Sequence, residues 1–360
     1  MAANPTRPFG LSQPNRREAL RRLGLVGLGL ATAGGTAALW GRAIGEMQSS
    51  AARGGSPVTH QLGWLKGVQF GGAFMADAQG FFEREKLDVT LAAGGVSTDY
   101  RTLVASGSTM VSEANIIAMI NGAIQKQPLM AFAAVFQRDA ACIASLSGKP
   151  ILGLADMLDK TICVPNVVRG QISGLLRRQG YDPQRVRFVP GGTDASLLIA
   201  GEVDGLYDWA TRLKPAMDAV GIPAHYLHFA DIGAPGYAEL LFARRDVLEQ
   251  NFDLFVRYTR ALVGGWQWMV DNPVETARLV CDRYAPPGTD LARQTAEAVL
   301  MRDYITDGDG TSRGLLWVDP DPFEQAIRLA YDAGDIPRGI RITPEDLMTS
   351  KVVEAVHAKG

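Results

Sequence analysis

The chain has 360 residues, which is too long for one small module, and the usual size of ~100–200 residues per domain favours two domains. With 47% hydrophobic and 21% charged residues it can bury a large core, which excludes disordered, collagen-like and coiled-coil chains. A net charge of -2 provides no basic domain for nucleic acid, and three cysteines are too few for a disulfide scaffold.

The first residues differ in charge from the remainder of the chain. Six arginines and one glutamate give residues 1–45 a charge of +5, so the remaining residues must carry -7 to reach the total of -2. Arg16 and Arg17 precede an uncharged, moderately apolar stretch of 18 residues at 23–40, which is the layout of an export signal and a weak membrane span. An amphipathic first helix is the alternative, but this stretch has no charged position to mark a solvent face.

Residues 15–21 resemble the signature read by the twin-arginine translocase, departing from it at Ala19, where an aromatic residue is usual. We therefore expect a periplasmic protein with a twin-arginine-type signal and a flexible spacer over residues 1–57. Small residues at 34–38 and 49–52 leave the cleavage site open, and an uncleaved N-terminal anchor is the alternative. No cysteine lies near the end of the apolar stretch, which excludes a lipid anchor.

Three cysteines in an oxidising compartment leave at least one without an intramolecular disulfide, and the count allows one such bond. Apolar neighbours around Cys142 and Cys163 favour a simpler interpretation, in which both are buried small hydrophobic residues.

Strand-like and helical segments alternate from Val58 onward, which is typical of a parallel α/β sheet. The pattern predicts strands at 59–64, 87–92, 110–113 and 129–136, with helices at 73–86, 99–106 and 115–125.

A turn-rich break at 147–150 precedes a second α/β series. Strands are expected at 161–164, 187–189, 206–209 and 225–228, with helices between them. A strand at 239–243 is followed by helices at 245–270, 273–283, 290–301 and 322–333. We therefore expect lobe I at 58–144 plus 238–360, completed by the returning helices, and lobe II at 145–237.

Motifs that carry catalysis are missing from the sequence. It contains no phosphate-binding GxxxxGK[ST], no GxGxxG after a strand, no GxSxG elbow and no HExxH. Four histidines offer little for acid–base or metal chemistry, and residues 307–310 form a polar turn rather than a calcium loop. We therefore predict no catalytic residue, no metal and no cofactor, and expect the chain not to be an enzyme.

An ordered series of short matches carries a resemblance to a known family. A strand and a loop at 64–76 lead into Gly80-Phe81-Phe82 and then into Leu87-Asp88-Val89, although Lys86 stands where glycine is usual. The series continues with Gly94-Gly95, Gly107, a GKTIxVP-like stretch ending at Pro165, Gly201 to Gly205, and 271–277. Over 59–284 the chain resembles the SsuA/THI5-like (NMT1/THI5) substrate-binding proteins of ABC transporters.

This resemblance implies a type II periplasmic binding protein, an α/β fold with two lobes, a hinge and a ligand cleft between them. The expected partners are a small-molecule solute, an ABC permease with its ATPase, and the translocase during export, with no nucleic acid. The strand pattern agrees independently, because ligands of α/β sheets collect beyond the carboxyl ends of the strands.

Candidate ligand-binding residues of lobe I follow three predicted strands, and each has a structural alternative. Trp64 could stack on a flat ligand and Gln69 could bond to it, whereas Phe70 could equally face the core. Polar groups before the second helix and at the third strand end could bind solute or cap helices. They are Ser97, Thr98, Asp99, Glu113 and Asn115.

Lobe II supplies two further groups. Asn166, Arg169 and Gly170 follow a strand, where Arg169 could hold an anionic substituent or simply be solvated. Tyr207, Asp208 and Trp209 end another strand and would suit a heteroaromatic ring with N–H donors, although Trp209 could instead pack under the following helix.

We therefore predict a small planar heteroaromatic solute, such as a pyrimidine precursor of thiamine or a flavin-like compound. The alternative is an aliphatic sulfonate, nitrate or carboxylate held by Arg169 and the helix start at 97–99. A second alternative is the pyrimidine-synthesising enzyme of the same family. The clustered cysteines and the site histidine that the resemblance associates with that enzyme are absent from this sequence.

Overall fold

The structure is a computed structural model that describes residues 55–95, 97–191, 195–234 and 236–358. The expected twin-arginine motif and its apolar stretch lie outside the described residues. Within those ranges, no helix has the length and apolar character needed to cross a membrane.

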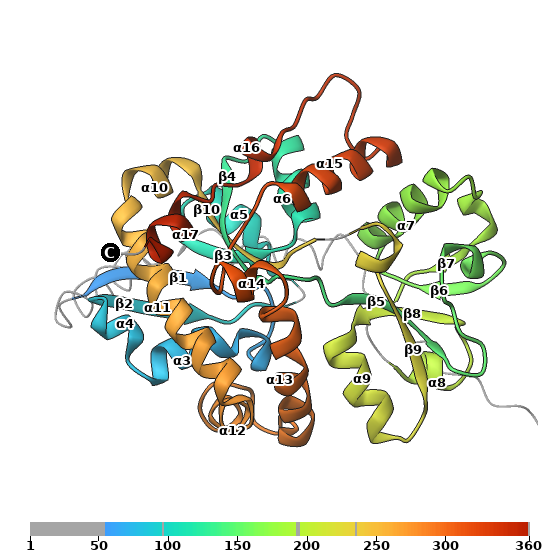
Figure 1. Cartoon of the computed structure of the whole chain (residues 1–360), viewed down its shortest axis with the longest axis horizontal. Helices are drawn as coiled ribbons and strands as arrows, with labels where there is room; N and C mark the ends of the chain where they lie inside the picture. Colours follow the sequence, from blue (N-terminus) through green and yellow to red (C-terminus); the bar gives the residue numbers. More distant parts are fainter. Residues whose placement is uncertain (1–54, 96, 192–194, 235, 359–360) are drawn as a thin grey trace, which may run out of the picture. The chain divides into compact units, whose positions relative to one another are not determined.

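The first sheet has five strands in the order β2-β1-β3-β10-β4 (Figure 1). They are β1 (Ser56–Gln61), β2 (Leu87–Ala92), β3 (Val111–Ala114), β4 (Leu129–Phe136) and β10 (Ala238–Arg244). β1 is parallel to β2 and β3, whereas β10 is antiparallel to β3 and β4. The expectation of a purely parallel sheet is therefore wrong, because the chain returns from the second sheet in the opposite direction.

The second sheet repeats this plan in the order β7-β6-β8-β5-β9. Its strands are β5 (Ala141–Leu146), β6 (Thr161–Cys163), β7 (Arg187–Val189), β8 (Gly205–Trp209) and β9 (Ala224–His228). The antiparallel member is β5, which pairs with both β8 and β9. Strand β5 was not predicted, because no helix separates it from β4.

In the described part of the chain, residues 137–140 connect β4 to β5, and residues 229–234 and 236–237 lie between β9 and β10. The expected lobe boundary at 144/145 falls inside β5, so the whole of β5 belongs with the second sheet. At the crossings, the amide of Asp139 donates to the carbonyl of Gly236 at 2.9 Å. This bond ties the two connecting segments together.

Helices surround each sheet, and two of the expected ones are divided. The predicted helix at 73–86 is α3 (Gly71–Ala78) and α4 (Phe81–Arg84), separated at Gly80, whose φ of 70° ends the first helix. The predicted helix at 245–270 is α10 (Arg245–Gln250) and α11 (Phe252–Asp271).

The other helices follow the expected order. In the first two-thirds of the chain they are α5 (Tyr100–Ala105), α6 (Ile116–Ile124), α7 (Asn166–Arg178), α8 (Ser196–Ile199) and α9 (Ala210–Ala219). The C-terminal ones are α12 (Pro273–Arg283), α13 (Leu291–Ile305), α14 (Asp309–Ser312), α15 (Asp321–Ala333), α16 (Pro344–Leu347) and α17 (Lys351–His357). Short 3-10 turns are η1 (Val68–Phe70), η2 (Leu154–Met157), η3 (Pro183–Arg185) and η4 (Ala230–Ile232).

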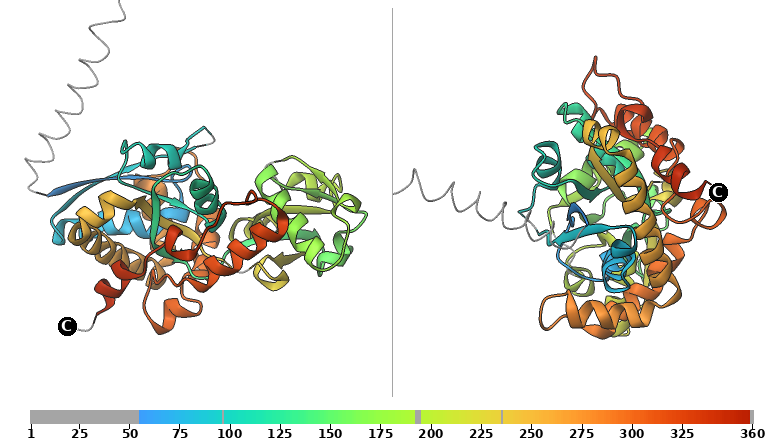
Figure 2. Two further views of the ribbon diagram at one scale, coloured as in Figure 1. Left: turned by 90° about the horizontal axis from the view of Figure 1, so that it is seen from above. Right: turned by 90° about the vertical axis from the view of Figure 1, so that its left-hand side faces the viewer.

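Close packing of α3 on α11 fixes the loop that precedes α3 (Figures 1 and 2). A Cβ atom on Gly72 would lie 2.0 Å from the Trp266 ring, and one on Gly265 would lie 2.1 Å from the Gly72 carbonyl oxygen. Only glycine permits this approach at either position. Because α3 is packed this closely on α11, it holds one end of the loop between β1 and α3 in place.

The C-terminal helices also contact the second lobe. The Tyr304 hydroxyl of α13 lies 2.8 Å from Nε2 of His228 in β9, and Arg177 of α7 donates to the Ala333 carbonyl of α15 at 3.2 Å. Two C-terminal helices that pack with the first lobe, α13 and α15, therefore also contact the second lobe, at β9 and at α7. Cys142 and Cys163 are buried as expected.

Candidate binding site between the lobes

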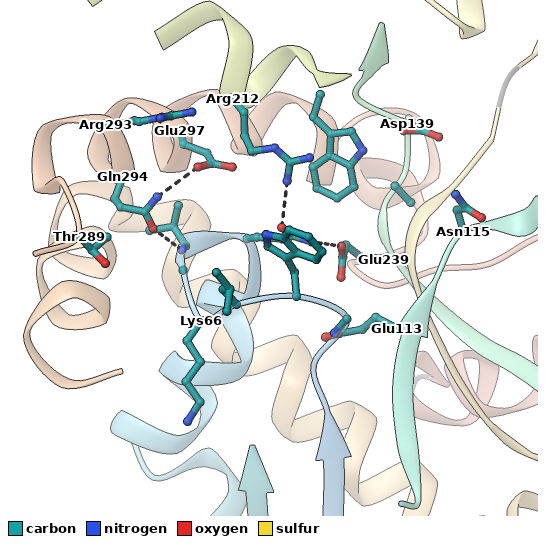
Figure 3. Close-up of a pocket in the computed structure, with 18 of the residues that line it drawn as sticks. Lys66, Glu113, Asn115, Asp139, Arg212, Glu239, Thr289, Arg293, Gln294 and Glu297 are labelled. Carbon is teal, nitrogen blue, oxygen red and sulfur yellow. Dashed lines mark hydrogen bonds between the residues drawn. The ribbon is translucent and has the colours of Figure 1, made fainter. Parts of the chain in front are cut away.

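A cavity of about 600 Å³ lies where the carboxyl ends of β1, β3 and β8 face one another (Figure 3). The start of β10 reaches the same place, because that strand runs antiparallel to its neighbours. The α13 helix and the preceding turn form a further wall. The polar and aromatic lining residues are Trp64, Lys66, Gln69, Tyr100, Glu113, Asn115, Asp139, Tyr207, Trp209, Arg212, Glu239, Thr289, Asp290, Arg293, Gln294 and Glu297.

The loop after β1 presents Trp64 to the cavity with 43% of its surface exposed. Two contacts hold this loop. The Val68 amide donates to Oε1 of Gln294 at 2.7 Å, and the Gly94 amide donates to the Trp64 carbonyl at 2.9 Å. A Cβ atom on Gly94 would lie 2.2 Å from the Leu62 carbonyl oxygen. The loop after β2 can therefore come this close to the loop after β1 only because residue 94 is glycine.

A chain of hydrogen bonds crosses from one lobe to the other. Gln69 donates from Nε2 to Oε1 of Glu239 at 2.5 Å and accepts on its own Oε1 from Arg212 at 3.1 Å. Arg212, in the first turn of α9, also donates to both carboxylate oxygens of Asp208, from Nε at 3.1 and 3.2 Å. The Arg212 charge is thereby neutralised within its own lobe before any solute arrives.

Glu239 has the least satisfied carboxyl group in the cavity. Its side chain is 7% exposed, and its Oε2 is buried without a hydrogen-bond partner. Its φ of 52° is unusual for a residue other than glycine within a strand, and such strain is typical of functional sites. Burial, followed by the charge of Glu113, raises the pKa of Glu239 well above its ordinary value.

Glu113, on the adjacent strand β3, has several polar neighbours. Its Oε2 accepts from the Gly63 amide at 3.3 Å, and its Oε1 lies 2.9 Å from Nε2 of the fully buried His60. On the other side of the His60 ring, Nδ1 lies 2.7 Å from the Tyr258 hydroxyl. Glu113 therefore has a polar group beside each of its carboxyl oxygens.

Two further acids line the remaining walls. Burial raises the pKa of Glu297 to about 7, although Arg212 and Arg293 act in the opposite direction, and Gln294 donates to its Oε2 at 3.3 Å. Burial likewise raises the pKa of Asp139 to about 6 at the crossing between the sheets. Figure 3 shows Glu297 beside Gln294 and Arg293, with Asp139 and Asn115 across the cavity from them. The cavity therefore concentrates carboxyl groups that burial tends to keep protonated.

Aromatic rings complete the lining. Trp209 contacts Phe136 edge-on, with ring centroids 5.1 Å apart, and the Arg212 guanidinium lies 4.8 Å from the Trp209 ring centre. Tyr207 lies beside Phe229, with centroids 5.6 Å apart, and burial raises the pKa of its hydroxyl. Trp64 and Tyr100 come from the first lobe, so both lobes contribute flat surfaces.

The structure brings together six of the predicted residues as cavity lining: Trp64, Gln69, Glu113, Asn115, Tyr207 and Trp209. Asp208 is buried behind the wall, where it holds Arg212. Asn115 has the structural role that the sequence left open as well, because its Oδ1 caps α6 by accepting from the Ala118 amide at 2.9 Å.

Other predicted residues lie outside the cavity lining. Phe70 is 0% exposed because the η1 turn directs it into the core. Ser97, Thr98 and Asp99 precede α5, and Asp99 caps that helix by accepting from the amide and hydroxyl of Thr102 at 3.1 and 2.8 Å.

The loop after β6 is also directed elsewhere. Asn166 and Arg169 are exposed on α7, and the Arg169 guanidinium lies 5.7 Å from the Phe188 ring centre. Gly170 faces Asp335 of the segment after α15, whose carboxyl oxygen would lie 3.3 Å from an added Cβ atom. This part of lobe II packs against the C-terminal helices, which sequence spacing could not reveal.

Sequence reasoning missed three prominent lining residues. Arg212 lies three positions after Trp209, so the strand-end argument could have included it. Glu239 begins the returning strand, and a charged residue in an apolar strand was the available signal. Glu297 carries no such signal, because its helix lies beyond the span of the family resemblance. Among the described residues, no cluster of histidine, cysteine and acidic side chains could hold a metal.

Two sheets of the same plan, joined by paired crossings around a cavity, define the periplasmic-binding-protein fold. The crystal structure of the aliphatic sulphonate-binding protein SsuA from Escherichia coli is similar, with a TM-score of 0.62 and 13% identity, covering 79% of this chain and 95% of that one. Residues 68–276 match the NMT1/THI5-like family, and the chain belongs to this family.

Two relatives are similar in sequence. The formylaminopyrimidine-binding protein of Halalkalibacterium halodurans is 22% identical over 244 residues, covering 66% of this chain and 74% of that protein. The 4-amino-5-hydroxymethyl-2-methylpyrimidine phosphate synthase of Schizosaccharomyces pombe is 22% identical over 239 residues, covering 62% and 68%. Both names contain an aminopyrimidine, although one protein binds its ligand and the other is an enzyme.

Proposed function

We propose that this chain is the solute-binding component of an ABC importer that captures an aminopyrimidine or a related planar nitrogen heterocycle. The observation that carries the proposal is the combination of exposed aromatic surface on Trp64 with the buried, half-satisfied carboxyl of Glu239 in one cavity. An amino group beside a ring nitrogen can bond to both oxygens of a carboxyl group, while the ring stacks on an aromatic face.

An aliphatic sulfonate is less well matched to this cavity. Anion sites need cationic or N–H donors that are not already used. Here Arg212 is held by Asp208, and the predicted anion-binding groups, Arg169 and the helix start at 97–99, do not line the cavity. The other cations of the lining, Lys66 and Arg293, share the cavity with the carboxyl groups of Glu113, Asp139, Glu239 and Glu297.

The enzymatic alternative finds little support in the cavity. Within the described part of the chain, the residues that line it include neither cysteine nor histidine, and His60 is shielded behind Glu113. A binding role also fits the hydrogen bond between Gln69 and Arg212, which joins the lobes across the site as a solute would. We propose periplasmic localisation after export by the twin-arginine route, and delivery of the solute to a membrane permease.

The experiment is isothermal titration of the purified chain with 4-amino-2-methylpyrimidine, riboflavin and an alkanesulfonate. We expect the aminopyrimidine to bind and Trp64→Ala to weaken its affinity at least tenfold. Leu152→Ala is the matched control, because Leu152 is 61% exposed and lies outside the cavity lining. Binding of the sulfonate alone, or an unchanged affinity in Trp64→Ala, would refute the proposal.

A further inference from the structure

Glu113 and Glu239 are neighbouring acids in the cavity, and they differ in how many polar groups surround their carboxyl oxygens. They lie on adjacent antiparallel strands, where Leu241 pairs with Glu113 and Leu240 pairs with Ala114. Glu113 has the Gly63 amide and the His60 ring beside its two oxygens. Glu239 has only the Gln69 amide on one oxygen, and its other oxygen is buried without a partner. Burial and the nearby charge of Glu113 accordingly raise the pKa of Glu239.

The remaining charged groups around Glu239 do not cancel the upward shift of its pKa. From α9, the charge of Arg212 favours ionisation, but Asp208 holds that guanidinium. From the crossing segment, Asp139 disfavours ionisation, and the Tyr100 hydroxyl from α5 carries no charge in the neutral range, since burial raises its pKa. These effects together favour a proton on Glu239, whose buried Oε2 has no hydrogen-bond partner.

We propose that Glu239 donates this proton to the solute, so that a neutral nitrogen heterocycle is bound as a cation against the Glu239 carboxylate. The O–H bond of the acid breaks and its electron pair stays on the carboxylate oxygen. The lone pair of the ring nitrogen takes the proton and forms an N–H bond. This inference rests on the proposed function and adds to it the class of solute, a weakly basic ring, and the residue that recognises it.

The transfer explains why the cavity has more acids than a neutral ring needs. After it, the single positive charge of the ring lies near two carboxylates, Glu239 and Glu113, and offsets part of the repulsion between them. A ring without a basic nitrogen would leave Glu239 protonated and would form only one neutral hydrogen bond with it. The site should therefore discriminate by ring basicity among molecules of the same shape.

The test is ¹⁵N nuclear magnetic resonance of ring-¹⁵N-labelled 4-amino-2-methylpyrimidine bound to the full chain at pH 8, where the free compound is neutral. We expect the bound ring nitrogen to show the large upfield shift of protonation. In Glu239→Gln, whose amide preserves the shape, the shift should be lost and the affinity should fall at least tenfold. Glu202→Gln is the matched control, because it makes the same change at an exposed acid outside the cavity lining, and the upfield shift should persist.

A second variant tests the proton's origin. In Glu113→Gln, Glu239 loses its charged neighbour and should ionise more readily, so the ring must take its proton from solvent. The affinity should then fall by up to tenfold per pH unit above neutrality, whereas that of the parent chain should stay nearly constant there.

The possible failures are distinguishable. If the compound binds with its ring nitrogen unprotonated, the proton transfer is refuted while the proposed function stands. If the shift persists in Glu239→Gln, or is lost in Glu202→Gln as well, the assignment to Glu239 is refuted. If the compound does not bind at all, both the inference and the proposed function fail.

Discussion

Replacing Glu297 with glutamine measures how much the ionisation of a buried acid in the cavity lowers the free energy of unfolding. Glu297 is on α13, 4% exposed, with Arg212 and Arg293 nearby and Gln294 donating to its Oε2. Glutamine has the same shape, and its carbonyl oxygen can accept the same bond from Gln294. The substitution therefore removes the ionisation of this side chain while keeping its packing and its hydrogen bond.

The magnitude follows from the pKa. Burial raises the pKa of Glu297 from 4.5 to about 7. The folded chain binds the proton more tightly than the unfolded chain, so the stability from this group is fully present below pH 4.5 and is lost as the pH rises through about 7. At 1.36 kcal/mol per pH unit, the loss is ~3 kcal/mol above neutrality. Glu297→Gln should avoid this loss.

Scanning calorimetry of both chains at pH 5 and pH 8.5 checks the prediction. At pH 8.5 the melting temperature of Glu297→Gln should exceed that of the parent by roughly 6 °C, at ~2 °C per kcal/mol for a chain of this size. At pH 5 the two should nearly coincide. An equal difference at both pH values would refute the reasoning, because it would show that the effect comes from packing and not from ionisation. Glu202→Gln, an exposed acid, is the control and should change neither value.

Three further predictions test packing and capping. Gly72→Ala should destabilise the fold by ~1–3 kcal/mol in urea titrations, because its Cβ would overlap the Trp266 ring, whereas Gly148→Ala, with open space around it, should be nearly neutral. Asp99→Ala should lower stability by ~1 kcal/mol through loss of the α5 cap, without changing solute affinity by titration calorimetry. Arg212→Gln should destabilise by ~3 kcal/mol by leaving buried Asp208 without its partner, and adding Asp208→Asn should recover much of that loss in the same unfolding assay.

Local sequence patterns located most elements of the fold, because each strand and helix carries its own signal. β2, β4, β7 and α12 coincide with the expected ranges. The β5 strand was missed, since a helix is expected between strands of a parallel sheet and none separates β4 from β5. Antiparallel pairing of β5 and β10 depends on where the chain crosses between sheets, which no local pattern encodes.

The candidate site was predictable where it follows strand ends and unpredictable elsewhere. Trp64, Glu113 and Trp209 were found because β1, β3 and β8 end at the cavity. The same rule placed Arg169 in the site, but α7 packs against α15, which carries Arg169 away from the cavity. Tertiary packing of helices far apart in the sequence overrode the local rule there.

The acids of the cavity illustrate how topology generates chemistry that single segments do not contain. Glu113, Asp139, Glu239 and Glu297 come from a strand end, a crossing, a returning strand and a C-terminal helix. In its own segment of the sequence, none of these acids indicates that the other three lie nearby. Burial raises the pKa of Asp139, Glu239 and Glu297, and the charge of Glu113 adds to the effect at Glu239, whose backbone is strained. Since such an arrangement lowers stability, a solute that supplies positive charge is the partner that it suits.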